Sequence, residues 1–307
     1  MKFGAIDIGS NAVRLLIADV TETENDLNIE KTSLVRVPVR LGSSVFEKGS
    51  ISSSKAKQLA KTMKAFRYLM DVHGVKAYRA CATSAMREAD NSEEVRQRVK
   101  EFSKVDIEII TGHTEANLIL STFKSHRLDP AKSYLYVDVG GGSTEITLLK
   151  NKKRVRSRSF KIGTVRLLKK KVKQALWDDM REWLTKLREE DLNDEITAIG
   201  TGGNINRYFK MSGHKYGELL HLATLEEMHL RMKKMTLKER MLKLRMRNDR
   251  ADVIVHAGDI YTAVMRTTGV HEISVPQMGL SDGIALDLFR KHHAAKAAAG
   301  KAAENKG

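Results

Sequence analysis

Two short glycine-rich turns, far apart in the chain, constrain the fold more than any other feature of the sequence. The first ends an apolar run that carries an aspartate, FGAIDIGSN at residues 3–11. The second repeats this arrangement in LYVDVGGGSTE at residues 135–145. In both, a strand delivers a carboxylate (Asp7 or Asp138) beside backbone that glycine allows to bend tightly. Two turns of the same design indicate that the chain contains duplicated halves.

The residues of these turns are suited to binding a phosphate. Glycine lets backbone amides crowd an anion, and an aspartate beside them can hold a hydrated Mg²⁺. Neither turn fits the better-known phosphate loops, because the chain has no G-x-x-x-x-G-K-[ST] and the three glycines at 140–142 lack the spacing G-x-G-x-x-G. The pattern therefore favours a polyphosphate held by both halves. The alternative is that each aspartate only caps its own turn through a side-chain oxygen.

Composition and charge limit the kinds of molecule that the protein can bind. The 307 residues, 41% of them hydrophobic, fit two domains of ordinary size. The net charge of +16 favours a polyanionic partner. Twelve Lys or Arg and no Asp or Glu lie between residues 146 and 177, either to guide a phosphate chain or as a solvated surface. A second basic stretch, 229–250, is typical of the exposed side of packed helices. Aromatic residues total 6% and are not interleaved with the basic ones, which argues against a nucleic-acid platform.

Other features bear on location. Every apolar run is interrupted by charge well short of the roughly 18 residues of a membrane span. The single cysteine, Cys81, cannot form an internal disulfide and is typical of a buried, inert thiol. We therefore expect a cytoplasmic protein without a membrane partner, and leave open a homodimer.

The order of expected elements indicates the fold class. Strands are expected at 3–8, 14–20 and 27–39, followed by a helix at 53–73 and then by alternating strands and helices. The second half restarts with strands from 133, a helix from 164 to about 188, and further helices at 249–266 and 282–292. This alternation predicts an α/β fold with mixed sheets.

Several stretches, in this order, resemble the exopolyphosphatase and guanosine pentaphosphate phosphohydrolase (Ppx/GppA) family of the sugar kinase, chaperone and actin superfamily. They are AIDIGSN at 5–11, ATSAMREA at 82–89, ITGHTEA at 110–116, VDVGGGSTE at 137–145, IGTVRL at 162–167, IGTGG at 199–203 and RADVI at 250–254. The resemblance extends from about residue 3 to about residue 289.

The resemblance implies two ribonuclease-H-like domains with an active-site cleft between them. We expect the first domain at 1–122, the second at 123–293 with its last helix packing back on the first, and a disordered basic tail at 294–307. The match is to a short form, without the helical C-terminal domain that larger members carry.

The resemblance also implies roles for individual residues. Glu115 matches the catalytic glutamate that acts as general base, while Thr114 stands where the family usually has another glutamate. Glu145 is the second carboxylate near the attacking water. Asp138 is expected to be a catalytic residue and a ligand of Mg²⁺ or Mn²⁺. Asp7 is the corresponding metal ligand of the first half. Arg87 matches an arginine that clamps phosphate, although a helix-surface arginine is the alternative. The expected phosphate-binding donors are Ser10, Asn11, Gly141, Gly142, Ser143, Thr144, Gly202 and Gly203.

The implied function is a Mg²⁺-dependent phosphohydrolase that releases terminal phosphate from inorganic polyphosphate or from guanosine penta- or tetraphosphate. Two alternatives stay open. A base such as Glu115 could deprotonate an alcohol, which would make the protein a phosphotransferase. The chain could also bind a polyanion or nucleotide as a sensor without turnover.

Overall fold

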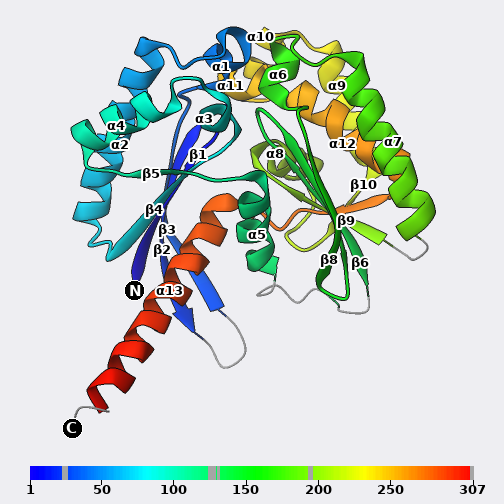
Figure 1. Ribbon diagram of the computed structural model, residues 1–307. Coiled ribbons are helices and arrows are strands. Elements are labelled where there is room, and N and C mark those ends of the chain that lie inside the picture. Colours follow the sequence, from blue (N-terminus) through cyan, green and yellow to red (C-terminus); the bar gives the residue numbers. More distant parts are fainter. Residues whose placement is uncertain (23–26, 124–128, 130–131, 193–195, 305–307) are drawn as a thin grey trace. The chain divides into compact units, whose positions relative to one another are not determined.

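The computed structural model describes residues 1–22, 27–123, 129, 132–192 and 196–304. It is an α/β fold with two mixed sheets, as the alternating pattern predicted (Figure 1). Each sheet belongs to its own compact unit. Unit 1 contains residues 1–39, 51–127 and 279–307, and unit 2 contains residues 40–50 and 128–278. The chain thus crosses to unit 2 for residues 40–50, returns to unit 1 at 51, crosses again at 128 and returns to unit 1 at 279.

The sheet of unit 1 has the strand order β3-β2-β1-β4-β5. β1 is antiparallel to β2, with which it forms a hairpin, and parallel to β4, to which the chain crosses over. The buried strand β1 therefore lies between the two. The strands are β1 (Lys2–Ile8), β2 (Val13–Glu22), β3 (Leu27–Val37), β4 (Ala77–Ala82) and β5 (Ile107–Ile109). The helices are α2 (Ser53–Val72), α3 (Ser84–Glu88), α4 (Ser92–Ser103), α5 (Gly112–Phe123) and α13 (Leu280–Glu304). Ser52 caps α2 by accepting a hydrogen bond from the Lys55 amide, as the serine-rich start predicted.

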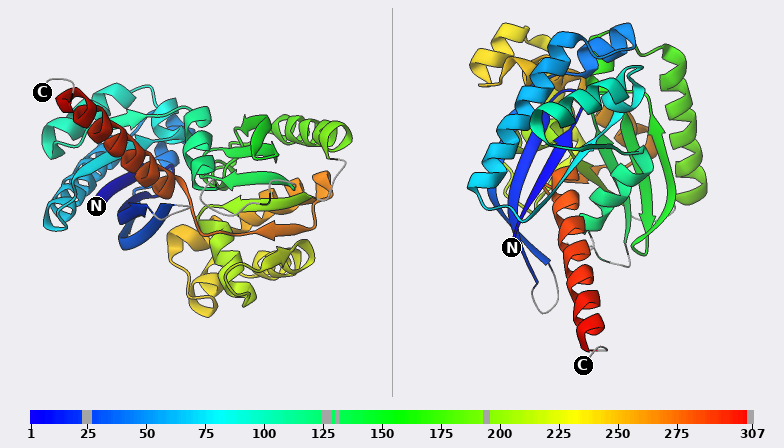
Figure 2. Two further views of the ribbon diagram at one scale, coloured as in Figure 1. Left: turned by 90° about the horizontal axis from the view of Figure 1, so that it is seen from below. Right: turned by 60° about the vertical axis from the view of Figure 1, so that its left-hand side comes forward.

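The last helix, α13, packs on the sheet of unit 1, and Figure 2 shows it from two further sides. Phe3 of β1 meets Phe289 edge to face at 6.2 Å. Arg79 of β4 donates to Asp287 at 2.7 Å, which ties the helix to the sheet by an ion pair. The helix continues through Glu304, so residues 294–304, expected as part of a disordered tail, are helical. Alanine has the highest helix propensity, which accounts for a helix without an apolar stripe.

The sheet of unit 2 has the order β10-β11-β9-β6-β7-β8. Its strands are β6 (Ser133–Val139), β7 (Thr144–Lys150), β8 (Lys153–Phe160), β9 (Ile196–Thr201), β10 (Leu219–His221) and β11 (Glu272–Ser274). Its helices are α1 (Gly42–Lys48), α6 (Thr164–Leu168), α7 (Gln174–Asp191), α8 (Gly203–Ser212), α9 (Leu222–Lys234), α10 (Leu237–Lys243), α11 (Asn248–Ala251) and α12 (Ile254–Thr268). The helix expected from 164 to about 188 is therefore two helices. The break contains Lys170, whose φ of 55° is left-handed and incompatible with a continuous helix.

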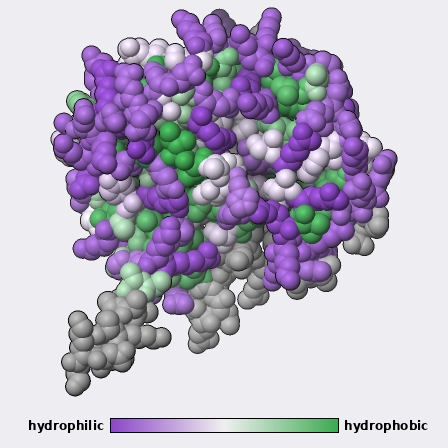
Figure 3. Space-filling view, in the orientation of Figure 1, coloured by the Kyte–Doolittle hydropathy of each residue, from purple (hydrophilic) through white to green (hydrophobic). Residues whose placement is uncertain are grey.

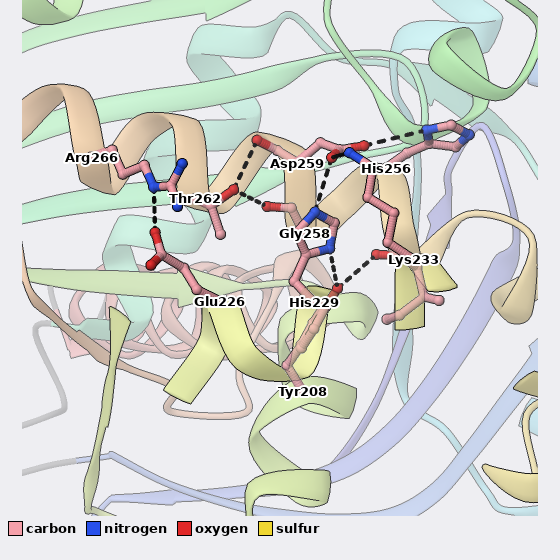
Figure 4. A network of polar contacts seen from close by, with 10 residues as sticks. Tyr208, Glu226, His229, Lys233, His256, Gly258, Asp259, Thr262 and Arg266 are labelled. Carbon is pink, nitrogen blue, oxygen red and sulfur yellow. Dashed lines mark hydrogen bonds and ion pairs between the residues drawn. The ribbon is translucent and has the colours of Figure 1, made fainter. Parts of the chain in front are cut away.

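A buried polar network joins three helices of unit 2 (Figure 4). The Nδ1 of His229 on α9 lies 3.2 Å from the Tyr208 hydroxyl on α8. Its Nε2 lies 2.9 Å from Oδ1 of Asp259 on α12, which also accepts from Lys233. Burial of a polar group is tolerated when its hydrogen bonds are satisfied, so this network fixes how α8, α9 and α12 pack.

Within the described part of the chain, no helix is long and apolar enough to cross a membrane. The face drawn in Figure 3 is largely hydrophilic, with scattered apolar side chains.

Candidate active site

The two glycine-rich turns are the same hairpin in the two units. In unit 1 the Gly9 amide donates to the Ala12 carbonyl at 3.1 Å, and in unit 2 the Gly140 amide donates to the Ser143 carbonyl at 2.9 Å. The strands that flank them are antiparallel. Asp7 lies opposite Arg14, and Asp138 lies opposite Glu145. Each aspartate thus pairs with the residue seven positions later in the chain, so the duplication predicted from sequence extends to the strand register.

The turn of unit 2, here called the glycine loop (140–143), has its carbonyls fixed by the segment that follows β8. The Gly140 carbonyl accepts from the Thr164 amide at 3.0 Å, and the Gly141 carbonyl accepts from the Val165 amide at 2.8 Å. The Gly142 carbonyl accepts from Nε of Arg166 at 2.6 Å. Three successive carbonyls therefore point toward residues 164–166.

The orientation of those carbonyls determines that of the amides. In a trans peptide group the C=O and the following N–H point in opposite directions. The amides of Gly141, Gly142 and Ser143 consequently point away from residues 164–166. In the described turns and loops, none of the backbone-to-backbone hydrogen bonds has one of these three amides as its donor. A row of aligned backbone N–H groups is the arrangement that binds phosphate oxygens in nests and at helix N-termini.

Gly163 is what lets the supporting segment approach the loop. A Cβ atom at position 163 would lie 2.4 Å from the carbonyl carbon of Gly142 and 2.6 Å from that of Gly141. Both neighbours are backbone and cannot move aside cheaply. The loop is further tied to this segment by Thr144, whose buried hydroxyl donates to the Ile162 carbonyl at 2.6 Å. The Thr144 side chain therefore holds the loop, and its predicted contact with phosphate stays a prediction.

The two predicted carboxylates of unit 2 lie on adjacent strands. Asp138 and Glu145 are directly opposite on an antiparallel pair, and such residues point to the same face of a sheet. Glu145 is buried, and its Oε1 accepts hydrogen bonds from the hydroxyls of Ser143 at 2.6 Å and Ser159 at 3.0 Å. Two donors to one oxygen stabilise the ionised carboxylate. The Ser143 hydroxyl is thus used to orient Glu145.

The third strand of this half brings Gly202 beside Asp138. β9 is parallel to β6 and places Thr201 next to Asp138. Gly202 has a φ of 100°, and a Cβ there would lie 3.2 Å from Oδ1 of Asp138, so glycine keeps this space open. Gly203 begins α8, whose N-terminal amides carry partial positive charge. The structure therefore brings Asp138, Gly202, Gly203 and Glu145 together, and their roles at a phosphate site stay a prediction.

Two buried tyrosines hold Thr201 in place. The Tyr261 hydroxyl donates to the Thr201 carbonyl at 2.7 Å, and the Tyr136 hydroxyl lies 2.8 Å from the Thr201 hydroxyl. Burial, and then the negative charge of Asp138, raise the pKa of both tyrosines well above the ordinary value. Both therefore stay neutral and keep their proton for these hydrogen bonds.

In unit 1 the corresponding carboxylate has an arginine partner. Asp7 accepts a hydrogen bond from Arg14 at 2.6 Å. The Ser10 hydroxyl, next in the turn, lies 2.8 Å from the Ser84 hydroxyl, and both side chains are buried. The structure places Ser10 and Asn11 in the turn after β1, as the sequence indicated.

Glu115 and Arg87 lie near each other in the same unit. Glu115 is in the first turn of α5, where its amide donates to Thr111, and it is almost entirely buried. Arg87 lies in the last turn of α3, donates to the Ile110 carbonyl at 2.8 Å, and has Nη1 4.0 Å from Oε2 of Glu115. A partly buried arginine that faces a buried glutamate differs from the helix-surface alternative. The pair combines a proton acceptor with a cation.

The oxygen donors of unit 2 are compatible with a divalent cation. Asp138 and Glu145 offer hard carboxylate oxygens, and Gly202 leaves space beside Asp138. Asp7 is less suited as a ligand, because Arg14 already occupies one of its oxygens. Among the described residues no group of three or more His, Cys, Asp or Glu could hold a metal by itself. This agrees with Mg²⁺, which is usually held by one or two carboxylates together with substrate phosphates.

Sequence reasoning missed the residues that support these turns. Arg166 was counted only as a member of the basic stretch 146–177, although it lies in the IGTVRL segment. Ser84, Ser159 and Gly163 were not assigned a function. Two arginines of the basic stretch instead pair with acids of α7: Arg156 donates to Glu190 and Asp191, and Arg158 to Asp179.

Comparisons with known proteins show what this chain is similar to. Exopolyphosphatase 2 of Mycobacterium tuberculosis is 27% identical over 318 residues, covering 94% of this chain and 98% of that protein. Exopolyphosphatase 1 of the same species is 25% identical over 308 residues, covering 93% and 88%. The crystal structure of an exopolyphosphatase from Cytophaga hutchinsonii has a TM-score of 0.81 and 25% identity, covering 95% of this chain and 98% of that one. The Ppx/GppA family member of Aquifex aeolicus has a TM-score of 0.75, also with 25% identity and the same coverage.

The model of the Ppx/GppA phosphatase family matches residues 19–292. This span includes the glycine loop, Glu115, Glu145 and the supporting segment 162–167. The chain therefore belongs to the Ppx/GppA phosphatase family.

Proposed function

We propose that this protein is a phosphohydrolase that releases the terminal phosphate of inorganic polyphosphate, with guanosine pentaphosphate as a second substrate. The observation that carries the proposal is the row of aligned amides of Gly141, Gly142 and Ser143 beside the Asp138–Glu145 pair. Relatives named exopolyphosphatase, at 25–27% identity over nearly the whole chain, support polyphosphate as the substrate. The net charge of +16 is also appropriate for a polyanion.

Hydrolysis of a phosphoanhydride needs shielding of phosphoryl charge and a water aimed in line with the leaving group. Shielding is assigned to the glycine-loop amides, the N-terminal amides of α8 at Gly202 and Gly203, and the turn residues Ser10 and Asn11. Arg87 adds a cation that can bind a phosphate oxygen while staying near Glu115.

Glu115 is proposed as the general base. Its burial disfavours a solvated carboxylate, while the neighbouring Arg87 favours the ionised form that accepts a proton. Glu145, whose Oε1 accepts from two serine hydroxyls, is proposed to orient the attacking water. A Mg²⁺ or Mn²⁺ held by Asp138, with Asp7 as a further candidate, would neutralise charge on the bound phosphates.

Two alternatives use the same residues. A phosphotransferase would release phosphate only to an added alcohol acceptor. A sensor would bind polyphosphate tightly without turnover, and its Glu115 would have no proton to accept.

The test is phosphate release, with Mg²⁺ and without acceptor, from pyrophosphate, tripolyphosphate, long-chain polyphosphate and guanosine pentaphosphate. We expect release from long chains in the parent protein. Glu115→Gln should lower the rate by about 10²–10⁴, the usual contribution of a general base, and leave polyphosphate binding near the parental value. The matched control is Glu94→Gln, which removes an exposed carboxylate of α4 in the same unit. Release that requires an acceptor, binding without release, or a Glu115→Gln rate within about twofold of the parent would each overturn the proposal.

A further inference from the structure

The last carbonyl of the glycine loop is held differently from the other two. The Gly140 and Gly141 carbonyls accept from the backbone amides of Thr164 and Val165. Any residue except proline supplies such an amide at those positions. The Gly142 carbonyl instead accepts from a side chain, Nε of Arg166, at 2.6 Å. The orientation of the peptide group between Gly142 and Ser143 therefore depends on the identity of one residue.

Arg166 is itself fixed in place by α1. Its side chain is 8% exposed, and its guanidinium carbon lies 3.9 Å from the centroid of the Phe46 ring. A guanidinium this close to an aromatic face, and shielded from water, gains from the cation–π interaction. At the surface nearby, Lys169, the residue after α6, donates to Glu47 of α1 at 2.7 Å. The loop, Arg166 and Phe46 thus form one stack within unit 2.

We infer that Arg166 is a positioning residue that sets the direction and donor strength of the Ser143 amide. Because the peptide group is planar and trans, drawing the Gly142 carbonyl toward Arg166 turns the Ser143 N–H to the opposite side. That N–H completes the row begun by Gly141 and Gly142. A cation at the carbonyl end also polarises the peptide group, which makes its N–H a better donor.

Phe46 is the second member of this arrangement. Removing the Phe46 ring should change the angle of the Arg166 guanidinium to the Gly142 carbonyl. The peptide group between Gly142 and Ser143 would then lose its fixed direction. The consequence for catalysis rests on the proposed function, since it needs a phosphate that the Ser143 amide binds. The orientation of the amide itself does not depend on that proposal.

Three variants and one control test the inference. Arg166→Gln removes the charge and the planar fork, Arg166→Lys keeps the charge without Nε, and Phe46→Leu removes the ring but keeps an apolar side chain. Lys169→Gln is the matched control, because it breaks the ion pair with Glu47 of α1 without touching the loop. Each protein is measured for phosphate release from long-chain polyphosphate and, in ¹⁵N-labelled form, for the chemical shift and hydrogen exchange of the Ser143 amide.

We expect Arg166→Gln to lower kcat by about 10²-fold, the loss typical of one preorganised donor, with a smaller change in KM. Arg166→Lys should lower kcat less than Arg166→Gln does. Phe46→Leu should lower kcat about 5-fold, because it weakens the cation–π contact. The Ser143 amide signal should move in all three and stay at its parental position in Lys169→Gln.

A folded Arg166→Gln protein with a parental Ser143 signal would overturn the inference, whatever its activity. Parental kcat in that variant, with an active parent protein, would overturn the catalytic consequence. If Arg166→Gln does not fold, Phe46→Leu decides by the same two measurements. If the parent protein releases no phosphate, the proposed function fails while the amide signals still test the positioning role.

Discussion

The two glycine hairpins have the same strand register but carry different charges. In unit 1, Asp7 faces Arg14 across the strand pair and is bound by it at 2.6 Å. In unit 2, Asp138 faces Glu145, whose Oε1 accepts hydrogen bonds from the hydroxyls of Ser143 and Ser159. One cross-strand position therefore decides whether the end of the hairpin is neutralised or strongly negative. The residue opposite the aspartate is thus a cation in unit 1 and a second carboxylate in unit 2.

The hairpins also differ in what supports them. The glycine loop of unit 2 lies against residues 163–166, which hold two of its carbonyls through backbone amides and the third through the Arg166 side chain. The turn of unit 1 is supported by the Thr83 amide, which donates to the Ile8 carbonyl at 3.1 Å, and by the hydroxyl contact of Ser10 with Ser84. Unit 2 thus holds its loop by two backbone donors and one side chain, whereas unit 1 supports its turn by one backbone donor and one contact between hydroxyls.

The largest expected effect comes from removing the two aspartate charges separately. Asp138→Asn should reduce phosphate release by about 10²-fold or more, because a bound metal supplies several kcal/mol of charge stabilisation. It should also shift the Mg²⁺ titration to higher concentration. Asp7→Asn should cost about tenfold or less in rate and leave the Mg²⁺ titration unchanged, since Arg14 already neutralises that carboxylate.

Thermal unfolding of both variants separates loss of fold from loss of chemistry. Equal losses of rate, with parental Mg²⁺ titrations in both variants, would mean that the aspartates cap their turns and that the charge difference between the hairpins has no chemical role.

The next largest effect concerns packing behind the glycine loop. Gly163→Ala would place a Cβ 2.4 Å from the Gly142 backbone, so either the loop or the segment must move. Overpacking of this kind costs about 1–3 kcal/mol, measurable by urea unfolding, and should abolish most phosphate release because the amides lose alignment. The matched control is Gly279→Ala, where a Cβ meets no atom within 4 Å. Parental stability and activity in Gly163→Ala would show that the loop does not need its backbone support.

The sequence predicted the parts of this molecule that follow from local pattern. Both strand-turn units, the aspartates at their ends and the α/β class came from glycine spacing and alternating apolar runs. The charge difference between Asp7 and Asp138 needed the strand register, since Arg14 and Glu145 become neighbours only when the hairpins form. The contacts of Arg166 could not be predicted from the run of twelve basic residues, because its partners, Gly142 and Phe46, are distant in sequence. Likewise, the pattern of apolar residues does not predict that residues 40–50 pack in unit 2.

The smallest expected effect tests the side-chain support of the unit 1 turn. Ser84→Ala removes the partner of the buried Ser10 hydroxyl at 2.8 Å, which should cost about 1 kcal/mol of unfolding free energy. If Ser10 binds phosphate as proposed, its loss of orientation should also raise KM for polyphosphate about two- to fivefold, with kcat nearly unchanged, as expected for uniform binding. Ser103→Ala is the matched control, because Ser103 is an equally buried serine of unit 1 whose hydroxyl donates to the Val99 carbonyl within α4. It should lose similar stability and keep the parental KM. A parental KM in Ser84→Ala as well would mean that the unit 1 turn needs no side chain to hold its shape, and that the two hairpins differ in charge but not in support.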